Sequence, residues 1–332
     1  MTSIGVGIVG FWHVHAADYA HDAARHTATR VVAGWDADPQ LGNEGAAALG
    51  IPFEESLDAL LARPDVDAVT ITTATADHTD VIGRALRAGK HVFSEKLLAP
   101  TAPECEALIA EASARGLQLV VSLPRLSEPV VRTAARLIGE GALGTVTYAR
   151  VRMAHDGWLA GWLPERFGDP VAAIGGAFAD LGCHPAYLVQ LFLGPVPQSV
   201  SATYGAHTGH AVEDNAVVVA GYGNGAVGVA EASFVTTPGA FALELRGTRA
   251  SLLYGFGGDE LIAKGDGFGD SWTPQPLDAA ADAPFDLWVD AIRTGSSAAV
   301  TANLDAAVAL TRFVVAANAS ASDHRIVAVG DN

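Results

Sequence analysis

The sequence predicts an α/β fold in which a doubly wound parallel sheet is followed by an α+β domain with a large open antiparallel sheet. The chain has 332 residues, which fits roughly two domains of ~150 residues. Short apolar runs alternate with helical patterns over the first third, as is typical of a parallel sheet with helices on both faces. Closely spaced alternating runs dominate later, as is typical of antiparallel strands. We therefore expect domains at residues 1–122 and 123–332.

In the first domain, each expected strand is a short apolar run and most of them lead into a helical pattern. Gly89 and Gly116 stand where helix C-caps are expected. The expected strands are 4–9, 30–35, 68–73, 91–94 and 117–122. The expected helices are 16–26, 57–61, 79–88 and 103–114.

The pattern changes after Leu123-Pro124. The sheet of this second domain is expected to have an open face, and such a face favours a homodimer or homotetramer. The stretch from 155 to 176 is irregular. The expected strands are 145–153, 198–204, 214–222, 226–234, 241–246 and 249–254. The expected helices are 130–140, 180–193, 285–294 and 303–322.

Composition excludes several classes of protein. Half of the residues are hydrophobic and the net charge is −17, which argues against binding to nucleic acid or to an anionic membrane. Cys105 and Cys183 are too few for a disulfide framework or a structural zinc site, and no metal site is predicted. The N-terminus has no basic region ahead of its apolar run, and no apolar stretch reaches ~18–20 residues. We expect a soluble, cytoplasmic protein with no membrane partner.

The first strand contains Gly5-Val6-Gly7-Ile8-Val9-Gly10, a literal G-x-G-x-x-G. A dinucleotide-binding turn must follow the strand, whereas Gly5 and Gly7 lie inside it. The proper frame begins at Gly10 and places Trp12 and His15 where the later glycines belong. This is weak evidence for a dinucleotide, and an ordinary strand-to-helix turn is the alternative. His13 and His15 could face a pyrophosphate or substrate, but capping of the first helical turn is favoured.

Asp36 strengthens the case for a dinucleotide. It ends the second strand, 26 residues after Gly10, where an acidic side chain accepts the ribose hydroxyls of NAD. Asp38 follows without an adjacent Arg or Lys, and two carboxylates would repel the 2′-phosphate of NADP. NAD is therefore preferred over NADP. The alternative is a turn aspartate before Pro39.

Two further clusters carry possible chemistry. Lys96 ends the fourth strand in Ser94-Glu95-Lys96, where a lysine could stabilise an alkoxide, although a surface salt bridge is the alternative. Asp180 and His184 are four residues apart, so a helix would place both on one face and orient a general base. An N-cap aspartate with a packed core histidine is equally compatible.

Together these segments resemble the glucose–fructose oxidoreductase/inositol dehydrogenase (Gfo/Idh/MocA) family. The resemblance covers the whole chain. The segments that carry it are Asp67–Thr73 with His78, Ala88–Lys96, Gly139–Gly144, Asp180–His184, Glu213-Asp214, Arg246–Thr248 and Phe285–Gly295.

The resemblance implies a Rossmann domain that binds NAD and a second domain that binds a small polyhydroxylated substrate. It implies hydride transfer between nicotinamide and a hydroxyl-bearing carbon of a sugar, glycoside or cyclitol. Lys96 matches the catalytic lysine, which would stabilise the alkoxide, while His184 would be the general base and Asp180 an orienting group. The expected cofactor-binding residues are Gly10, Phe11, Trp12, His13, Asp36, Thr73, Ala74, His78, Glu95 and Lys96. The expected substrate-binding residues are Lys96, His155, Trp158, Asp180 and His184, and His155 and Trp158 belong to an aromatic loop that suits sugar stacking.

Three departures from the family pattern bear on the site. Trp12 and His15 replace glycines, so the pyrophosphate turn is expected to have a different shape. Leu97 replaces the proline after the catalytic lysine, and because a non-proline cis peptide bond is costly, we expect a trans bond and a shifted Lys96. Tyr187 stands where many members carry a further aspartate, so one polar substrate contact is lost or supplied by a phenol.

Two alternative functions remain open at this stage. The altered glycine turn is compatible with a non-redox NAD(H)-binding sensor or partner subunit. Retention of Lys96, Asp180 and His184 argues against it. The other alternative is an NAD-dependent glycoside hydrolase or lyase that oxidises its substrate transiently.

Overall fold

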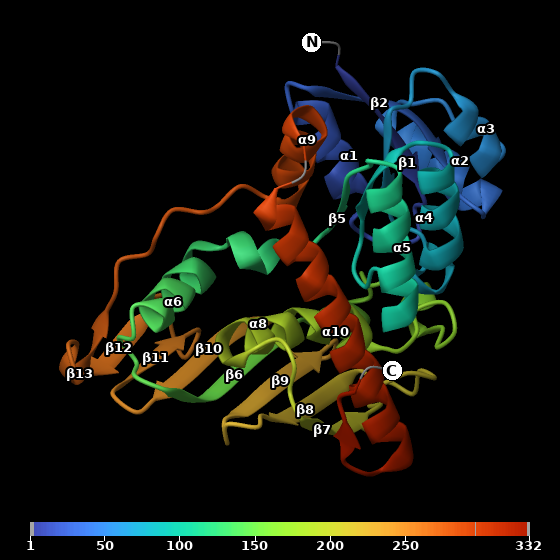
Figure 1. Cartoon of the computed structure of the whole chain (residues 1–332). Coiled ribbons are helices and arrows are strands. Elements are labelled where there is room, and N and C mark those ends of the chain that lie inside the picture. The colour runs from blue at the N-terminus through green and yellow to red at the C-terminus, as the bar shows by residue number, and fades with distance from the viewer. Residues whose placement is uncertain (1–2, 296, 331–332) are drawn as a thin grey trace. The chain divides into compact units, whose positions relative to one another are not determined.

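The computed structural model describes residues 3–295 and 297–330. The chain divides into two compact units (Figure 1). The first runs to Leu123 and includes Asp282–Val308, and the second comprises Pro124–Ala281 and the chain from Ala309 onward. Each unit has its own sheet, and the predicted fold class is confirmed.

The sheet of the first unit is parallel, with the strand order β2-β1-β3-β4-β5. Its strands are nearly continuous buried runs, because helices cover both faces of such a sheet. The strands are β1 Ile4–Val9, β2 Thr29–Trp35, β3 Ala68–Ile71, β4 His91–Ser94 and β5 Leu119–Val121. The helices between them are α1 Ala16–Arg25, α2 Pro39–Leu49, α3 Leu57–Ala62, α4 His78–Arg87 and α5 Ala102–Ala114, and a 3-10 turn, Thr75–Asp77, precedes α4.

Helix α2 is absent from the sequence-based expectation. Its two glycines, Gly42 and Gly45, weaken a helical pattern. Its capping is nevertheless complete: the Asp38 side chain accepts the N–H groups of Gln40 and Leu41, and Pro39 occupies the first turn. The glycines serve packing, because a Cβ on Gly45 would lie 2.2 Å from the Phe11 ring.

Helix α9, Pro284–Thr294, and the first part of α10, Ala298–Asp323, belong to the first unit. The sequence analysis assigned both to the second domain. Trp288 packs against Phe93 with ring centroids 5.7 Å apart, and its Nε1 donates to the Gln118 carbonyl oxygen. Asn303 bonds both backbone groups of Val121, each at 2.9 Å. These contacts join residues far apart in the chain, so no local pattern reveals them.

The sheet of the second unit is mostly antiparallel, in the order β13-β12-β11-β10-β6-β9-β8-β7-β14. The β6–β9 pair is parallel. The strands are β6 Val146–Ala154, β7 Ser199–Gly205, β8 Asn215–Gly221, β9 Val227–Ser233, β10 Ala240–Gly247, β11 Ala250–Tyr254, β12 Ile262–Gly265, β13 Gly269–Pro274 and β14 Val327–Ala328. The sequence analysis did not predict the last three: β12 and β14 are short, and β13 is almost wholly exposed.

Helix α8, Cys183–Leu193, is nearly all buried and packs on β6 and β9. A helix that is apolar on all sides must be covered, and this one lies over the middle of the sheet. A π-helical segment, Phe178–Gly182, leads directly into it. The unit also contains α6 Pro129–Gly139, α7 Gly157–Ala160 and the 3-10 turns Pro124–Ser127 and Glu165–Gly168.

Helix α10 is longer than the expected segment 303–322. Its 26 residues meet the length and hydropathy criteria for a membrane span, which contradicts the expectation that no stretch reaches that length. The core helix of a globular protein meets the same criteria, and Phe313, Val314 and Ala317 of α10 are buried.

Candidate functional site

The turn after β1 places a glycine beside the end of β3. Gly10 has φ +92°, and a Cβ at this position would lie 2.5 Å from the Thr73 backbone nitrogen. Only glycine fits this close approach. Gly5 and Gly7 lie within β1, as predicted, and a Cβ on Gly5 would meet the Asp65 carbonyl oxygen at 1.8 Å. The literal glycine motif therefore serves strand packing.

Phe11 and Asp36 fix the shape of this turn. The Phe11 ring packs against Gly34 and Gly45, and its backbone N–H donates to Asp36 Oδ2 at 2.5 Å. Asp36 Oδ1 accepts the Asp38 N–H at 2.8 Å, and the side chain is buried. Asp36 thus lies at the end of β2, as predicted, and also holds the turn after β1.

The two histidines of the turn differ in their roles. His13 is buried; its backbone N–H donates to the Thr72 carbonyl oxygen at 2.9 Å, and its Nδ1 accepts the His15 N–H at 3.2 Å. The His15 ring lies at the protein surface, with Nδ1 2.7 Å from Asp18 Oδ2. It makes no cap hydrogen bond to α1. His13 therefore closes the turn, and its Nε2 lies 3.9 Å from Glu95 Oε1. The side chain of Trp12 is partly exposed.

A buried ion pair lies at the end of β4. Lys96 Nζ is 3.3 Å from Glu95 Oε1, and the two side chains are 3% and 2% exposed. The Tyr19 hydroxyl of α1 donates to Glu95 Oε2. Burial raises the pKa of Glu95, but the charges of His13 and Lys96 outweigh it and lower that pKa to about 2. Glu95 is thus an ionised partner that holds Lys96.

Tyr19 was not predicted as a site residue. Its hydroxyl group would have been the signal, because it lies on the buried side of an amphipathic helix and needs a polar partner there. Burial and the charge of Glu95 raise the pKa of Tyr19 well above its ordinary value, so the phenol stays protonated.

The Lys96–Leu97 peptide bond is cis, which contradicts the expected trans bond. The prediction considered only the intrinsic preference of the bond, whereas the surroundings hold this segment. Leu97, Leu98 and Ala99 are buried, and His78 Nδ1 lies 2.7 Å from the Leu97 carbonyl oxygen.

His78 connects the ends of β3 and β4. Its Nε2 lies 3.3 Å from the Thr73 carbonyl oxygen, and complete burial lowers its pKa. Thr73 and Ala74 are buried at the end of β3, and Thr73 Oγ1 has no hydrogen-bond partner among the described residues. The predicted cofactor residues thus surround the carboxyl ends of β1, β2, β3 and β4, the edge at which parallel sheets bind ligands.

These residues fit a dinucleotide. Gly10 lets the turn after β1 pass close to the Thr73 backbone, and the start of α1 offers backbone N–H groups. Asp36 supplies a carboxylate at the β2 end, and the unpartnered Thr73 hydroxyl supplies a polar contact. Trp12 makes the turn bulkier than a glycine-rich one.

In the second unit, Asp180 lies in the π-helical segment and His184 in the first turn of α8. The segment that was expected to form one helix from Asp180 is therefore divided between the π-helical segment and α8. Glu213 holds the start of the segment, because its Oε1 accepts the N–H groups of Gly176 at 3.1 Å and Phe178 at 2.8 Å. The sequence analysis noted Glu213 only as part of a family resemblance, and its role depends on a contact across 35 residues.

His184 is buried and has a phenol as its neighbour. His184 Nδ1 lies 2.9 Å from Tyr187 Oη, and the Arg125 N–H donates to the same oxygen at 3.1 Å. Tyr187, which the sequence analysis considered for substrate contact, is itself only 2% exposed. The phenol is therefore a partner of His184.

The loop after β6 holds the two other predicted substrate residues. The His155 ring stacks on Phe234 with centroids 4.9 Å apart, and Trp158 stacks on His210 at 3.9 Å. Trp158 Nε1 is buried without a hydrogen-bond partner. Burial lowers the pKa of His155, and the charge of Asp180 opposes this shift. Asp180 and the aromatic loop are thus electrostatic neighbours.

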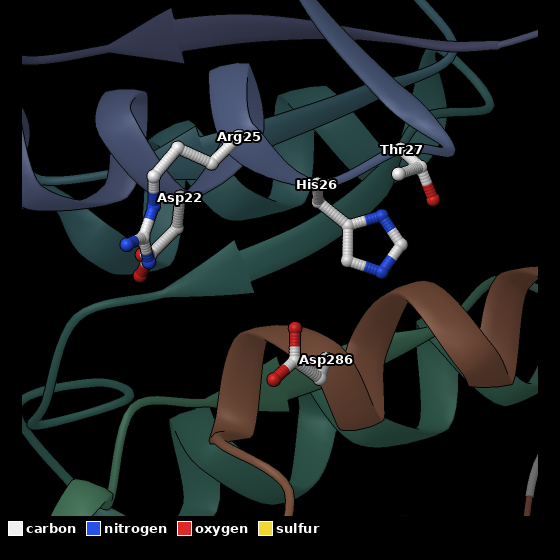
Figure 2. Close-up of a pocket in the computed structure, with 5 residues that line it drawn as sticks. All are labelled: Asp22, Arg25, His26, Thr27 and Asp286. Atoms are coloured by element: carbon white, nitrogen blue, oxygen red, sulfur yellow. The ribbon is translucent and has the colours of Figure 1, made fainter.

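A separate pocket of about 460 Å³ lies at the other edge of the first sheet. Figure 2 shows its residues around the end of α1 and the start of α9: Asp22, Arg25, His26, Thr27 and Asp286. Arg25 pairs with Asp22 at 3.2 Å. The residues that line this pocket include none of the predicted site residues. The pocket lies near the start of β2 rather than at the strand ends that bind ligands.

Comparison with protein families covers most of both units. Residues 4–123 match the model described as "Oxidoreductase family, NAD-binding Rossmann fold", and residues 131–253 match the GFO/IDH/MocA C-terminal domain. The first unit therefore contains an NAD-binding Rossmann fold. The chain belongs to the Gfo/Idh/MocA oxidoreductase family.

Individual relatives are similar over part of their length. The chain is 37% identical over 151 residues to dTDP-3,4-didehydro-2,6-dideoxy-α-D-glucose 3-reductase of Actinomadura kijaniata, covering 45% of this chain and 43% of that protein. It is 31% identical over 200 residues to inositol 2-dehydrogenase of Rhizobium meliloti, covering 60% and 56%. The matched part thus spans about half the length of these relatives.

Among solved structures, GenD2 from gentamicin A biosynthesis in complex with NAD matches with a TM-score of 0.83 and 26% identity. The match covers 99% of this chain and 97% of that one. Levoglucosan dehydrogenase in complex with NADH matches with a TM-score of 0.81 and 22% identity over the whole of both chains, which shows the shared fold.

Proposed function

We propose that this protein is an NAD-dependent oxidoreductase that transfers a hydride between nicotinamide and a hydroxyl-bearing carbon of a sugar, glycoside or cyclitol. The observation that carries the proposal is the buried Glu95–Lys96 pair at the end of β4. An ammonium group held at this ligand-binding edge suits a developing alkoxide. The relatives named as reductases and dehydrogenases of sugars and inositol support the substrate class.

In the proposed reaction, bound NAD supplies the hydride acceptor. His184 takes the proton of the substrate hydroxyl while the hydride leaves the same carbon. Lys96 donates a hydrogen bond to the oxygen as negative charge develops on it. Asp180 orients the substrate or His184, and His155 and Trp158 present rings that suit a sugar. Glu95 keeps Lys96 in place.

Asp36 supports the preference for NAD over NADP. Its carboxylate lies at the end of β2 and is anchored by two backbone N–H groups. A fixed negative charge accepts ribose hydroxyls and repels a 2′-phosphate.

The experiment combines binding with turnover. Calorimetry with cofactor-stripped protein is expected to show micromolar NAD binding and much weaker NADP binding. A screen of sugars and cyclitols for NADH formation then identifies a substrate. Lys96→Ala and His184→Ala are each expected to lower turnover by about a hundredfold or more, with the exposed Lys264→Ala as the control. Near-normal turnover in either site variant would contradict these roles.

One relative favours a second candidate function. The chain is 28% identical over 216 residues to 2,7-anhydro-N-acetylneuraminate hydratase of Mediterraneibacter gnavus. Net conversion of a glycoside without accumulated NADH would indicate a lyase or hydrolase that oxidises its substrate transiently. Binding of NAD without turnover of any substrate would instead favour a sensor or partner subunit.

We also propose a homodimer or homotetramer formed through the second sheet. Val217 and Val219 of β8 are 42% and 40% exposed, whereas their neighbours Val218 and Ala220 are buried. One face of these strands is therefore covered and the other presents apolar side chains. Sedimentation analysis tests this, since a monomer at micromolar concentration would contradict it.

A further inference from the structure

Tyr187 is the residue of interest because its hydroxyl has a defined set of partners. The Arg125 backbone N–H donates to Oη at 3.1 Å, and His184 Nδ1 lies 2.9 Å from the same oxygen. Among the described residues, these are its only two hydrogen-bond partners. All three groups belong to the second unit.

These two partners indicate where the hydroxyl proton of Tyr187 points. A phenol oxygen can accept one hydrogen bond while it donates another. The Arg125 N–H can only donate, so it uses a lone pair of Oη. The phenol is protonated, because burial raises the pKa of Tyr187 well above its ordinary value. The remaining partner for its O–H is His184 Nδ1, which must then act as the acceptor.

We propose that Tyr187 is a positioning residue that fixes the ring of His184 and holds neutral His184 in the tautomer with its proton on Nε2. This inference rests on the proposed function only for its kinetic consequence. The tautomer itself follows from the Arg125–Tyr187–His184 chain of hydrogen bonds.

The tautomer has a consequence for the substrate. Neutral His184 in this tautomer carries its N–H donor on Nε2, the ring nitrogen that does not face Tyr187. A donor suits a carbonyl oxygen, which accepts hydrogen bonds and has no proton to give. For His184 to accept a hydroxyl proton at Nε2, the ring proton must instead lie on Nδ1, so the tautomer that Tyr187 holds suits reduction of a carbonyl.

The matched test uses two buried tyrosines of the second unit. Tyr187→Phe removes the hydroxyl that bonds His184. Tyr222→Phe removes a buried hydroxyl that has no hydrogen-bond partner within the described part of the chain, and serves as the control. The first readout is the long-range ¹H–¹⁵N spectrum of ¹⁵N-histidine-labelled protein without substrate. His184→Asn identifies the His184 signals, whose shifts report which ring nitrogen carries the proton.

We expect neutral His184 of the wild type and of Tyr222→Phe to carry its proton on Nε2, and Tyr187→Phe to give a mixture of tautomers. A proton on Nδ1 in the wild type, or an unchanged tautomer in Tyr187→Phe, would overturn the proposal.

The second readout is kinetic. Tyr187→Phe is expected to lower kcat for carbonyl reduction by about tenfold or more with little change in KM, because the Nε2 proton of His184 is no longer held toward the carbonyl oxygen. Tyr222→Phe should retain wild-type kinetics. Unchanged kcat in Tyr187→Phe would overturn the positioning role. If instead His184→Asn retains full turnover, the proposed function of His184 fails while the spectrum still tests the tautomer.

Discussion

Each unit buries a glutamate close to its predicted site residues, and the two glutamates have opposite environments. Glu95 in the first unit lies against Lys96 and Tyr19, with His13 nearby, and its pKa falls to about 2 despite burial. Glu213 in the second unit accepts hydrogen bonds from the backbone N–H groups of Gly176 and Phe178. Burial, with a smaller contribution from Asp214, raises its pKa.

The difference shows what each unit must hold in place. A buried ammonium group needs a full counter-charge, so the first unit keeps an ionised carboxylate beside Lys96. The second unit has to fix a backbone segment that leads to His184, and backbone N–H donors are sufficient partners for that. The first site is therefore held by an ion pair and the second by hydrogen bonds from backbone N–H groups.

The largest expected effect is a difference in stability at pH 7 between a variant of Glu95 and a variant of Glu213. Glu95→Gln removes the carboxylate charge that lies 3.3 Å from the buried Lys96 ammonium and is expected to lower the free energy of unfolding by about 3–5 kcal/mol. Glu213→Gln keeps Oε1, which accepts both N–H groups, and is expected to cost about 1 kcal/mol or less. Urea unfolding followed by tryptophan fluorescence measures both.

The double variant Glu95→Gln/Lys96→Met is the control for this interpretation. It removes both charges of the pair and should recover part of the stability lost in Glu95→Gln. Equal costs for Glu95→Gln and Glu213→Gln would break the comparison between the two units.

The second prediction concerns the sign of the pH dependence. The pKa of Glu95 is about 2 in the folded protein against an ordinary 4.5. Its contribution is therefore present above pH 4.5 and is lost as pH falls toward about 2, with a total of about 3 kcal/mol. The stability advantage of the wild type over Glu95→Gln should shrink over this range.

Glu213 should show the opposite sign. Because its pKa is raised, ionised Glu213 destabilises the fold at neutral pH, and this penalty disappears as pH falls through its folded pKa toward 4.5. The wild type should therefore gain stability relative to Glu213→Gln over that interval. The same sign for both glutamates would contradict the assigned environments.

The smallest effect concerns the cofactor edge of the first unit. Asp36→Asn removes the charge and one of the two oxygens that accept the Phe11 and Asp38 N–H groups, and is expected to weaken NAD binding by about tenfold while NADP binding weakens less. Calorimetry with both cofactors measures the ratio. Asp58→Asn, which alters an exposed ion pair with Arg84, is the control. An unchanged ratio in Asp36→Asn would remove the charge argument for NAD.

Much of the fold could be predicted because periodicity is local. The alternation of apolar runs and helical patterns predicted the five parallel strands, and the frame argument correctly placed Gly5 and Gly7 inside β1. The sequence analysis did not predict helix α2, because Gly42 and Gly45 weaken the helical pattern and are typical of a loop. Their reason is tertiary, since Gly45 makes room for Phe11 and Gly42 for Phe53.

The candidate site could be predicted only in part. Residue type and position at strand ends identified Lys96 and Asp36, and the residue spacing identified Asp180 with His184. The partners of these residues could not be found that way, because Tyr19 lies 76 residues from Glu95 and Arg125 lies 62 residues from Tyr187. The Lys96–Leu97 bond was predicted wrongly for the same reason, since its surroundings come from other parts of the chain.

The sequence by itself determined the class of fold, the family and the residue types available for chemistry, because apolar periodicity and short motifs are properties of neighbouring residues. Only the tertiary structure decided which unit α9 joins, which carboxylate faces Lys96 and which group bonds His184. Those outcomes depend on burial, and burial is set by segments that meet only in the folded chain. A buried charge or hydrogen bond acquires its energy from these distant partners, so its role is fixed after folding.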